Sequence, residues 1–96
     1  MEKEKTFANG QIVSSQRGNI LTYYFKTGVV KATGPVLGDQ QMDGTWVFYR
    51  ENGMLWQEGH FKAGEKHGQW RRYNKNGQLE YEAEFSCGKE VRKQLY

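Results

Sequence analysis

The sequence predicts an all-β protein, with about six strands in a single antiparallel meander sheet of successive β-hairpins. Three observations predict this fold class. Glycine occurs 12 times and proline once, which is typical of short strands joined by tight turns. The C-terminal half alternates apolar and polar residues with a period of two. A 24-residue pattern also occurs twice within a chain short enough to be a single domain, residues 1–96.

The repeated pattern defines the organisation of the chain. Residues 44–67 and 68–91 align without a gap and are identical at nine of 24 positions. Both read Gly-x-Trp-x-x-Tyr-x-x-Asn-Gly-x-Leu-x-x-Glu-x-x-Phe-x-x-Gly. Residues 20–43 form a degenerate copy at a spacing of 25, in which Leu21 stands at the tryptophan position. We expect this copy to cap the array, because the end units of repeat proteins are usually atypical.

The two ends of the chain fit the pattern less well. In the N-terminal segment, residues 1–19, the run Asn9-Gly10-Gln11-Ile12 resembles the turn of the later units and is interpreted as a possible half repeat. Residues 92–96 are interpreted as a C-terminal tail. We expect residues 1–6 and this tail to be poorly ordered, as chain ends often are.

Each complete unit is predicted to form one hairpin around an Asn-Gly turn, Asn52-Gly53 in the first and Asn76-Gly77 in the second. Both positions of such a turn accept positive φ at low cost. Two-residue turns there, with a four-residue loop over residues 63–66, set the register. The predicted neighbours are Tyr49 and Trp56, Val47 and Glu58, Trp46 and Gly59, Gly59 and Trp70, Glu58 and Arg71, Tyr73 and Glu80, Arg71 and Glu82, and Trp70 and Ala83. The small residues in this register leave room for the tryptophan rings opposite them.

The alternation assigns the side chains to two faces of the sheet. The apolar face is the predicted core: Trp46, Phe48, Leu55, Phe61, Trp70, Leu79, Tyr81, Ala83 and Phe85. The other face carries Val47, Tyr49, Trp56, Glu58, His60, Arg71, Tyr73, Glu80, Glu82 and Glu84. Three ways to cover the core stay open, because one meandering sheet has no second layer. The sheet curls on itself, the N-terminal segment folds across it, or a second chain covers it.

The row Tyr49–Trp56–Tyr73 on the polar face is the predicted partner-binding site, together with Glu58 and Arg71. Tyrosine, tryptophan and arginine are the residues favoured in binding hot spots. Two other interpretations stay open: cross-strand aromatic pairs that only stabilise the sheet, and a stacking platform for single-stranded nucleic acid. The net charge of +3 supports nucleic acid only weakly, because the second half of the chain mixes nine Lys or Arg with seven Glu.

No set of residues predicts a catalytic, metal or cofactor site, so we expect a non-enzymatic protein that holds neither metal nor cofactor. His60 and His67 are interpreted as surface histidines, and Cys87 as a small turn residue. The glutamates of residues 80–84 lie along one strand face, where catalytic carboxylates could also lie. A cross-strand ladder explains their charges without catalysis. Its members are Glu58, Arg71 and Glu82.

The sequence also indicates a cellular compartment. A single cysteine cannot form an intramolecular disulfide. No segment approaches the roughly 20 apolar residues of a membrane-spanning helix, and the N-terminus lacks the apolar stretch of a secretory signal. We therefore expect a cytoplasmic protein without a membrane span.

The repeated segments resemble MORN repeats, in particular a bacterial variant. The motifs that carry the resemblance are Tyr49-x-x-Asn52-Gly53 and Gly64-Glu65-Lys66-His67-Gly68-Gln69-Trp70. It is good over residues 44–91, weak over residues 20–43, and ends at residues 90–92, where His-Gly would be expected. The resemblance implies an elongated sheet of hairpins that acts as an interaction scaffold and has no chemistry of its own.

A protein partner is therefore the leading expectation, and the function expected is that of a protein–protein interaction module. The partner would dock on the aromatic polar face or pair with an exposed sheet edge. Many bacterial members of the variant family are described as antitoxin components, so the alternative is an antitoxin that neutralises a cognate toxin. A homo-oligomer also stays open, because a second copy would cover the apolar face.

Overall fold

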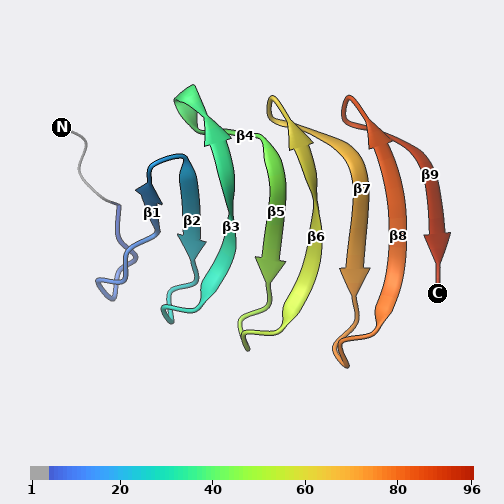
Figure 1. Ribbon diagram of the computed structural model, residues 1–96. Helices are drawn as coiled ribbons and strands as arrows, with labels where there is room; N and C mark the ends of the chain where they lie inside the picture. The colour runs from blue at the N-terminus through green and yellow to red at the C-terminus, as the bar shows by residue number, and fades with distance from the viewer. Residues whose placement is uncertain (1–4) are drawn as a thin grey trace.

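The computed structural model describes residues 5–96 as one open antiparallel sheet (Figure 1). Strands pair in chain order, except that the short β4 pairs only with β3. The bounds are β1 Ser14–Arg17, β2 Ile20–Tyr24, β3 Val30–Leu37, β4 Gln41–Met42, β5 Gly44–Tyr49, β6 Leu55–Lys62, β7 Glu65–Tyr73, β8 Leu79–Ser86 and β9 Lys89–Leu95, with a 3-10 turn at Gly38–Gln40 between β3 and β4. The predicted all-β meander of hairpins is confirmed.

The sheet has nine strands, more than the six predicted. Both ends of the chain extend it beyond the two clear repeats. Residues 92–95, interpreted from the sequence as tail, belong to β9, which pairs with β8 along its length. At the other end Thr6 bridges to Ile12, and the amide of Val13 donates to the carbonyl of Lys5 (2.9 Å). Residues 1–4 of the end predicted to be poorly ordered lie outside the described part.

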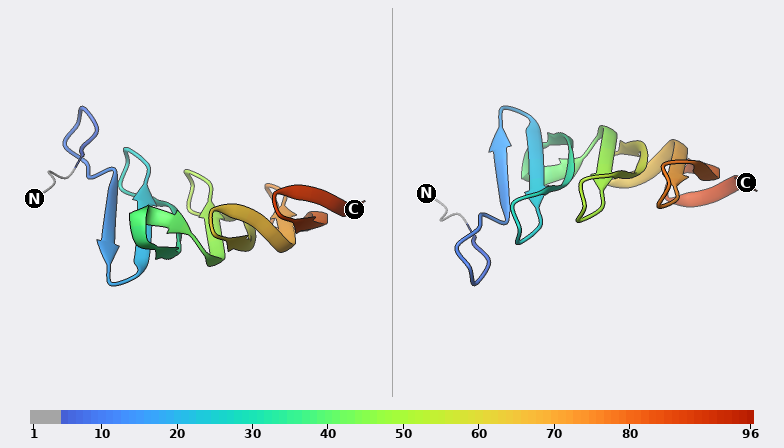
Figure 2. Two further views of the ribbon diagram at one scale, coloured as in Figure 1. Left: turned by 90° about the horizontal axis from the view of Figure 1, so that it is seen from above. Right: turned by 90° about the horizontal axis from the view of Figure 1, so that it is seen from below.

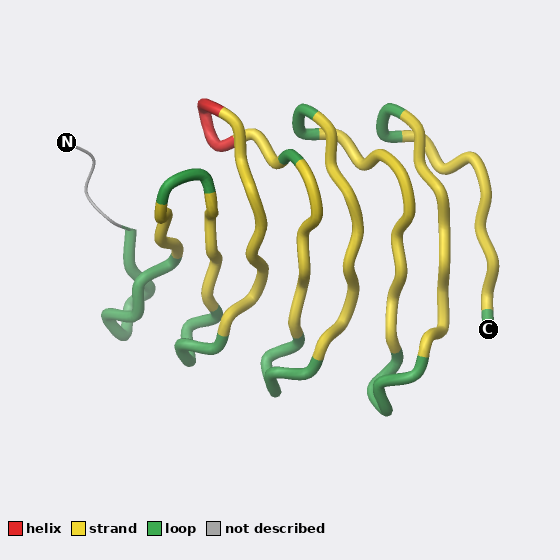
Figure 3. Tube along the Cα trace, in the orientation of Figure 1, coloured by secondary structure: helices red, strands yellow, loops and turns green. Residues whose placement is uncertain are grey.

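The sheet is a single layer, with extents of 42 × 32 × 18 Å (Figure 2). Its turns form two rows at opposite margins of the sheet (Figure 3). β1 and β9 lie at its two ends (Figure 1). No helix within residues 5–96 is long and apolar enough to cross a membrane.

One row of turns contains the Asn-Gly pairs, and these turns are longer than predicted. In residues 50–54 the amide of Arg50 donates to the carbonyl of Met54 (2.8 Å), and the amide of Gly53 donates to the carbonyl of Arg50 (2.9 Å). The same two bonds occur in residues 7–11, 25–29 and 74–78. The half repeat proposed at residues 9–12 therefore does contain the turn of the later units.

The long turns change the register beside them. Gly53 has φ +88°, whereas Asn52 keeps a negative φ, so a two-residue turn that needs positive φ at both positions does not form. A bulge follows in each hairpin. Tyr49 therefore pairs with Leu55, and Tyr73 with Leu79, and the predicted pairs of Tyr49 with Trp56 and of Tyr73 with Glu80 are wrong. Because opposite residues share a face, both leucines leave the predicted core face for the polar one.

The other row of turns contains the two-residue turn that the sequence places at Asn-Gly. Ala63 and Gly64 have φ +49° and +89°, and Cys87 and Gly88 have +48° and +84°. β6 and β7 therefore meet at a two-residue turn, in place of the predicted four-residue loop over residues 63–66. A register shift after Gly59 absorbs the difference. The pairs in the middle of the strands, from Trp46–Gly59 to Trp70–Ala83, are confirmed.

The core lies on the face that bears Trp46 and Trp70, called here the tryptophan face. The side chains of Trp46 and Trp70 are 0% and 2% exposed. Each ring lies across a glycine of the strand before it. A Cβ placed on Gly34 would lie 2.4 Å from Trp46, and one on Gly59 would lie 2.0 Å from Trp70. Only glycine fits beneath these rings.

Ala83 occupies the position equivalent to Gly59, and the structure explains why alanine is allowed there. Trp70 pairs with both residues, and its ring lies over Gly59, where a Cβ would be 2.0 Å from it. On its other side Ala83 faces Lys93 of β9, whereas Gly59 faces Trp70 of β7. The predicted pair of Ala83 with Trp70 is confirmed, and no tryptophan stands on the far side of Ala83 to exclude its Cβ.

The tryptophans are covered by side chains of the same sheet, so no second layer is needed to bury them. Edge-on rings flank them: the centroids of Phe61 and Trp70 are 5.1 Å apart, and those of Phe85 and Trp70 are 6.2 Å apart. The indole nitrogens donate to carbonyls of the preceding strand, Trp46 Nε1 to Pro35 (2.8 Å) and Trp70 Nε1 to His60 (2.9 Å). The two tryptophans are thus buried by side chains of neighbouring strands within one open sheet, without the predicted curling of the sheet on itself.

Candidate binding surface

The five predicted partner-binding residues fall into two groups. Glu58, Arg71 and Tyr73 lie together on the polar face, the side of the sheet opposite the tryptophan face. Tyr49 lies on this face too, nearer the N-terminal end. Trp56 is separated from the tyrosines by the bulge, so the continuous row predicted from the sequence is not formed.

Glu58, Arg71 and Tyr73 are held by a hydrogen-bonded network. The Tyr73 hydroxyl donates to Glu58 Oε1 (2.8 Å), and Arg71 Nε donates to Glu82 Oε2 (2.8 Å). The Tyr96 hydroxyl donates to Glu82 Oε1 (2.6 Å) and thereby fastens the end of the chain to the polar face. The predicted ladder has the right register, but its charges pair differently: Arg71 forms its ion pair with Glu82, while Glu58 bonds to tyrosine.

The network shifts the protonation of its members. Hydrogen bonds from Tyr96 and from Arg71 hold the pKa of the Glu82 carboxyl below its ordinary value of 4.5. The bond to Glu82 raises the pKa of Tyr96, and the bond to Glu58 raises that of Tyr73. These shifts report favourable contacts with the charged carboxylates in the folded state.

The lowered pKa of Glu82 predicts a loss of stability in acid. A carboxyl with a lower pKa in the folded than in the unfolded chain contributes stability above its unfolded pKa, and this contribution is lost as the pH falls through the folded value. We expect the urea midpoint to fall below about pH 4.5. Urea unfolding of wild type and Glu82→Gln between pH 7 and pH 3 measures it. Glu82→Gln should show a shallower acid dependence, and an equally steep fall would contradict the assignment.

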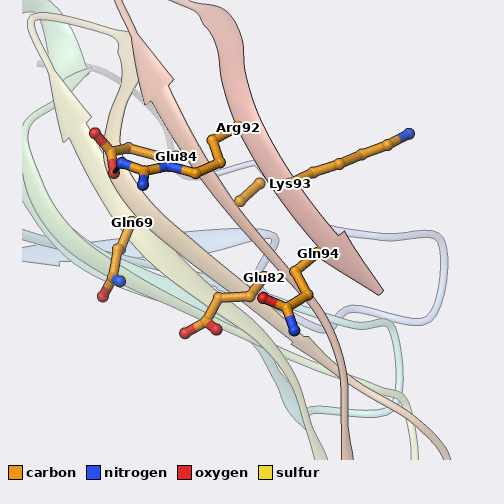
Figure 4. A pocket seen from close by; sticks show the side chains of 7 residues that line it. Gln69, Glu82, Glu84, Arg92, Lys93 and Gln94 are labelled. Atoms are coloured by element: carbon orange, nitrogen blue, oxygen red, sulfur yellow. Dashed lines mark hydrogen bonds and ion pairs between the residues drawn. The ribbon is translucent and has the colours of Figure 1, made fainter. Parts of the chain in front are cut away.

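Shallow polar pockets lie beside this network. The larger one, about 320 Å³, is at the C-terminal end of the sheet (Figure 4). It is lined by Gln69, Glu82, Ala83, Glu84, Arg92, Lys93 and Gln94. Arg92 pairs with Glu84 (2.9 Å), and Lys93 points away from them (Figure 4). A pocket of about 160 Å³ occupies the equivalent place one unit earlier, lined by Thr45, Glu58, Gly59, His60, Gln69 and Arg71.

Two larger pockets lie at the Asn-Gly margin of the sheet, on opposite sides of the β5–β6 hairpin. The first, called the tyrosine pocket, has a volume of about 480 Å³. It is lined by Thr22, Tyr24, Val29, Val30, Thr33, Tyr49 and Gly53. Thr33 pairs with Val47, so this pocket opens on the polar face. Its lining includes no charged side chain.

The second, called the indole pocket, has a volume of about 410 Å³. It is lined by Phe25, Lys31, Phe48, Tyr49, Arg50, Glu51 and Trp56. Phe48 contacts both Trp46 and Trp70, with centroids 6.3 and 5.9 Å away, so this pocket opens on the tryptophan face. Lys31 Nζ lies 5.8 Å from the centroid of the Phe25 ring. Trp56 thus lines the indole pocket and not the tyrosine pocket, and Tyr49 lines both.

The histidines and the cysteine make ordinary surface contacts. His60 Nδ1 lies 3.0 Å from Thr45 Oγ1, and the amide of Cys87 donates to His67 Nδ1 (3.3 Å). Within residues 5–96 no three His, Cys, Asp or Glu side chains converge as metal ligands would. The features of the described residues that could bind another molecule are therefore the pockets and the polar network above.

Sequence reasoning missed the lining contributed by the degenerate unit. Thr22, Thr33, Phe25 and Lys31 all lie in residues 20–43 and were not singled out. The signal was present at the spacing of 25, since Thr33 stands at the place of Glu58 and Phe25 at the place of Arg50. In the later unit, Arg50 reaches forward and donates from Nη2 to the carbonyl of Tyr73 (3.0 Å).

Comparison with known proteins identifies the repeat. The model of the MORN repeat variant family matches residues 42–63 and residues 66–86. Both matches begin at the N-terminal side of a tryptophan-bearing strand and cover the hairpins β5–β6 and β7–β8. No curated protein and no solved structure gives a significant match. Each of these two segments is therefore a MORN-type repeat, and the match supports a relation to the MORN repeat family.

Proposed function

We propose that the protein is a non-enzymatic protein-binding module whose partner engages the Asn-Gly margin of the sheet. The observation that carries this proposal is the pair of pockets on opposite faces of the β5–β6 hairpin. Tyr49 lines both pockets, and Trp56 lines one of them. A partner that binds on both faces of this margin would contact Tyr49 and Trp56 at the same time.

The composition and order of the margin support binding. Tyrosine, tryptophan and arginine dominate interface hot spots, and all three are present here. Tyr49, Arg50 and Trp56 are half-buried, so much of their conformational freedom is already restricted before a partner binds. The network of Glu58, Tyr73 and Arg71 continues this surface as a polar rim.

Affinity capture with matched variants tests the proposal. The wild-type protein, immobilised and exposed to a lysate of its source organism, should retain a stoichiometric protein partner. Tyr49→Ala and Trp56→Ala should lose it while keeping the circular dichroism spectrum of the wild type. Lys93→Ala, at the far end of the sheet, should retain it. A partner held equally by all four proteins would refute the Asn-Gly margin as the site, and no partner at all would refute the module.

The same capture separates the alternatives carried from the sequence. An antitoxin role requires that the captured partner arrest growth when it is expressed alone and that co-expression of this protein relieve the arrest. Single-stranded nucleic acid requires a row of bases stacked on successive aromatic side chains. The bulge removes Trp56 from such a row, so a protein partner is the better supported of the two.

A further inference from the structure

The tyrosine pocket exists because the first unit is degenerate. Its two walls, Tyr24 and Tyr49, are equivalent residues one unit apart, and Tyr73 is the third member of this series. Between Tyr49 and Tyr73 the corresponding space is filled by larger side chains. Glu58 stands there at the place of Thr33, and Met54 at the place of Val29.

Contacts in the two spaces differ accordingly. Between the later tyrosines, Glu58 accepts a hydrogen bond from Tyr73, and Met54 Cε lies 3.9 Å from a Cβ placed on Gly77. Between the earlier ones, a Cβ placed on Gly53, the equivalent glycine, meets nothing within 4 Å. The smaller side chains of the first unit therefore leave a pocket between Tyr24 and Tyr49, whereas larger side chains occupy the equivalent space between Tyr49 and Tyr73.

The open space also leaves a hydrogen-bond donor free. The hydroxyls of Tyr24 and Tyr73 have partners, Ser15 Oγ (3.1 Å) and Glu58 Oε1 (2.8 Å). Within residues 5–96 the Tyr49 hydroxyl has none. Thr33 is too short to replace glutamate, and its Oγ1 already bonds to Thr22 Oγ1 (2.9 Å). An occupant with an oxygen acceptor would supply the missing partner.

The chemistry of the lining selects the occupant by charge and shape. None of the seven lining residues is charged, in a chain of which 26% is charged, so an ionised group would be desolvated there without a counter-charge. Tyr24 and Tyr49 lie on β2 and β5, two strand spacings or about 10 Å apart at the backbone. One planar ring placed between them would lie about 5 Å from each, within the range of aromatic stacking.

We propose that the tyrosine pocket takes an uncharged aromatic side chain with an oxygen acceptor, a tyrosine or a phenylalanine with its own backbone carbonyl, presented by the protein partner. This inference rests on the proposed binding function and names the anchor of that interaction. The ring lies between Tyr24 and Tyr49, and its oxygen accepts from the Tyr49 hydroxyl. The degenerate first unit is then a recognition unit as well as the end of the array.

A titration with N-acetyl-tyrosinamide tests the proposal without the partner. In ¹H–¹⁵N correlation spectra of the full chain, the amides of Thr22, Thr33 and Tyr49 should shift saturably, and N-acetyl-glutamate amide should leave them unmoved. Tyr49→Phe, which removes only the hydroxyl, should weaken binding by about three- to tenfold. Equal shifts with both probes, shifts that do not saturate, or full affinity in Tyr49→Phe would overturn the proposal.

A second variant introduces into the first unit the side chain found at the equivalent position of the next unit. Thr33→Glu places in the first unit the residue that fills the next one, so it should fold and should bond to Tyr49 as Glu58 bonds to Tyr73. We expect it to abolish the shifts, whereas Gln69→Ala, elsewhere on the polar face, should preserve them. Undiminished binding by folded Thr33→Glu would refute the pocket as the binding site.

The two proposals fail in distinguishable ways. If the probe binds as expected but capture retains no partner, the pocket chemistry stands and the binding module fails. If a partner is captured and lost in Tyr49→Ala while the probe does not bind, the module stands and the aromatic anchor fails.

Discussion

Trp70→Ala is expected to lower the free energy of unfolding by about 3–5 kcal/mol, the usual cost of removing a large buried aromatic side chain. Trp70 is 2% exposed, packs edge-on against Phe61 and Phe85, and donates to the carbonyl of His60. Its ring also covers Gly59 of the preceding unit, so the substitution weakens the interface between two repeats. Urea unfolding followed by circular dichroism measures the change.

Trp56→Ala is the matched control, because it removes the same side chain from a half-buried position beside a pocket. We expect a clearly smaller loss of stability, together with the loss of partner described above. If Trp56→Ala unfolds the protein while Trp70→Ala is benign, the assignment of core and surface is inverted.

Gly59→Ala is expected to destabilise the protein by about 1–3 kcal/mol, as overpacking of a filled core does. The added Cβ would lie 2.0 Å from Trp70 Cδ2, and the indole cannot retreat because its Nε1 is bonded to the His60 carbonyl. Gly34→Ala should behave similarly, since its Cβ would lie 2.4 Å from Trp46. Thermal unfolding midpoints and urea unfolding would measure both.

Two positions serve as controls for this prediction. Ala83 shows that alanine is accepted at the equivalent place where no tryptophan follows. Gly38→Ala adds a methyl group at a position with nothing within 4 Å, so it should leave the stability unchanged within about 0.5 kcal/mol. A Gly59→Ala protein as stable as Gly38→Ala would show that the indole does not need the glycine.

The architecture could be predicted because it depends on local and repeated features of the sequence. Apolar–polar alternation specifies strands with two different faces, and the 24-residue period specifies that the same hairpin occurs twice. The assumed turns set the register in the middle of the strands, the small residues opposite the tryptophans supported it, and bulges beside the actual turns preserve it. These pairs, Trp46–Gly59 and Gly59–Trp70, are present as predicted.

The ends of the hairpins could not be predicted in the same way. Asn-Gly and Ala-Gly both offer a turn, and the chain forms its two-residue turn at Ala63-Gly64 and its longer turn around Asn52-Gly53. The sum of turn length and bulge is constrained by the pairing of the whole hairpin. The turn propensity of a short segment does not specify how turn length and bulge combine. An error of one residue in the register is enough to separate Trp56 from Tyr49.

The sequence by itself determined the repeat, the two faces in the middle of the strands, and the phenylalanines that pack around Trp46 and Trp70. Only the tertiary structure decided how a single layer buries its tryptophans and where its pockets lie. Burial depends on which glycine each ring covers in the neighbouring strand. The tyrosine pocket depends on the absence of side-chain volume at Thr33 and Val29, and empty space becomes visible only when the residues around it are in place.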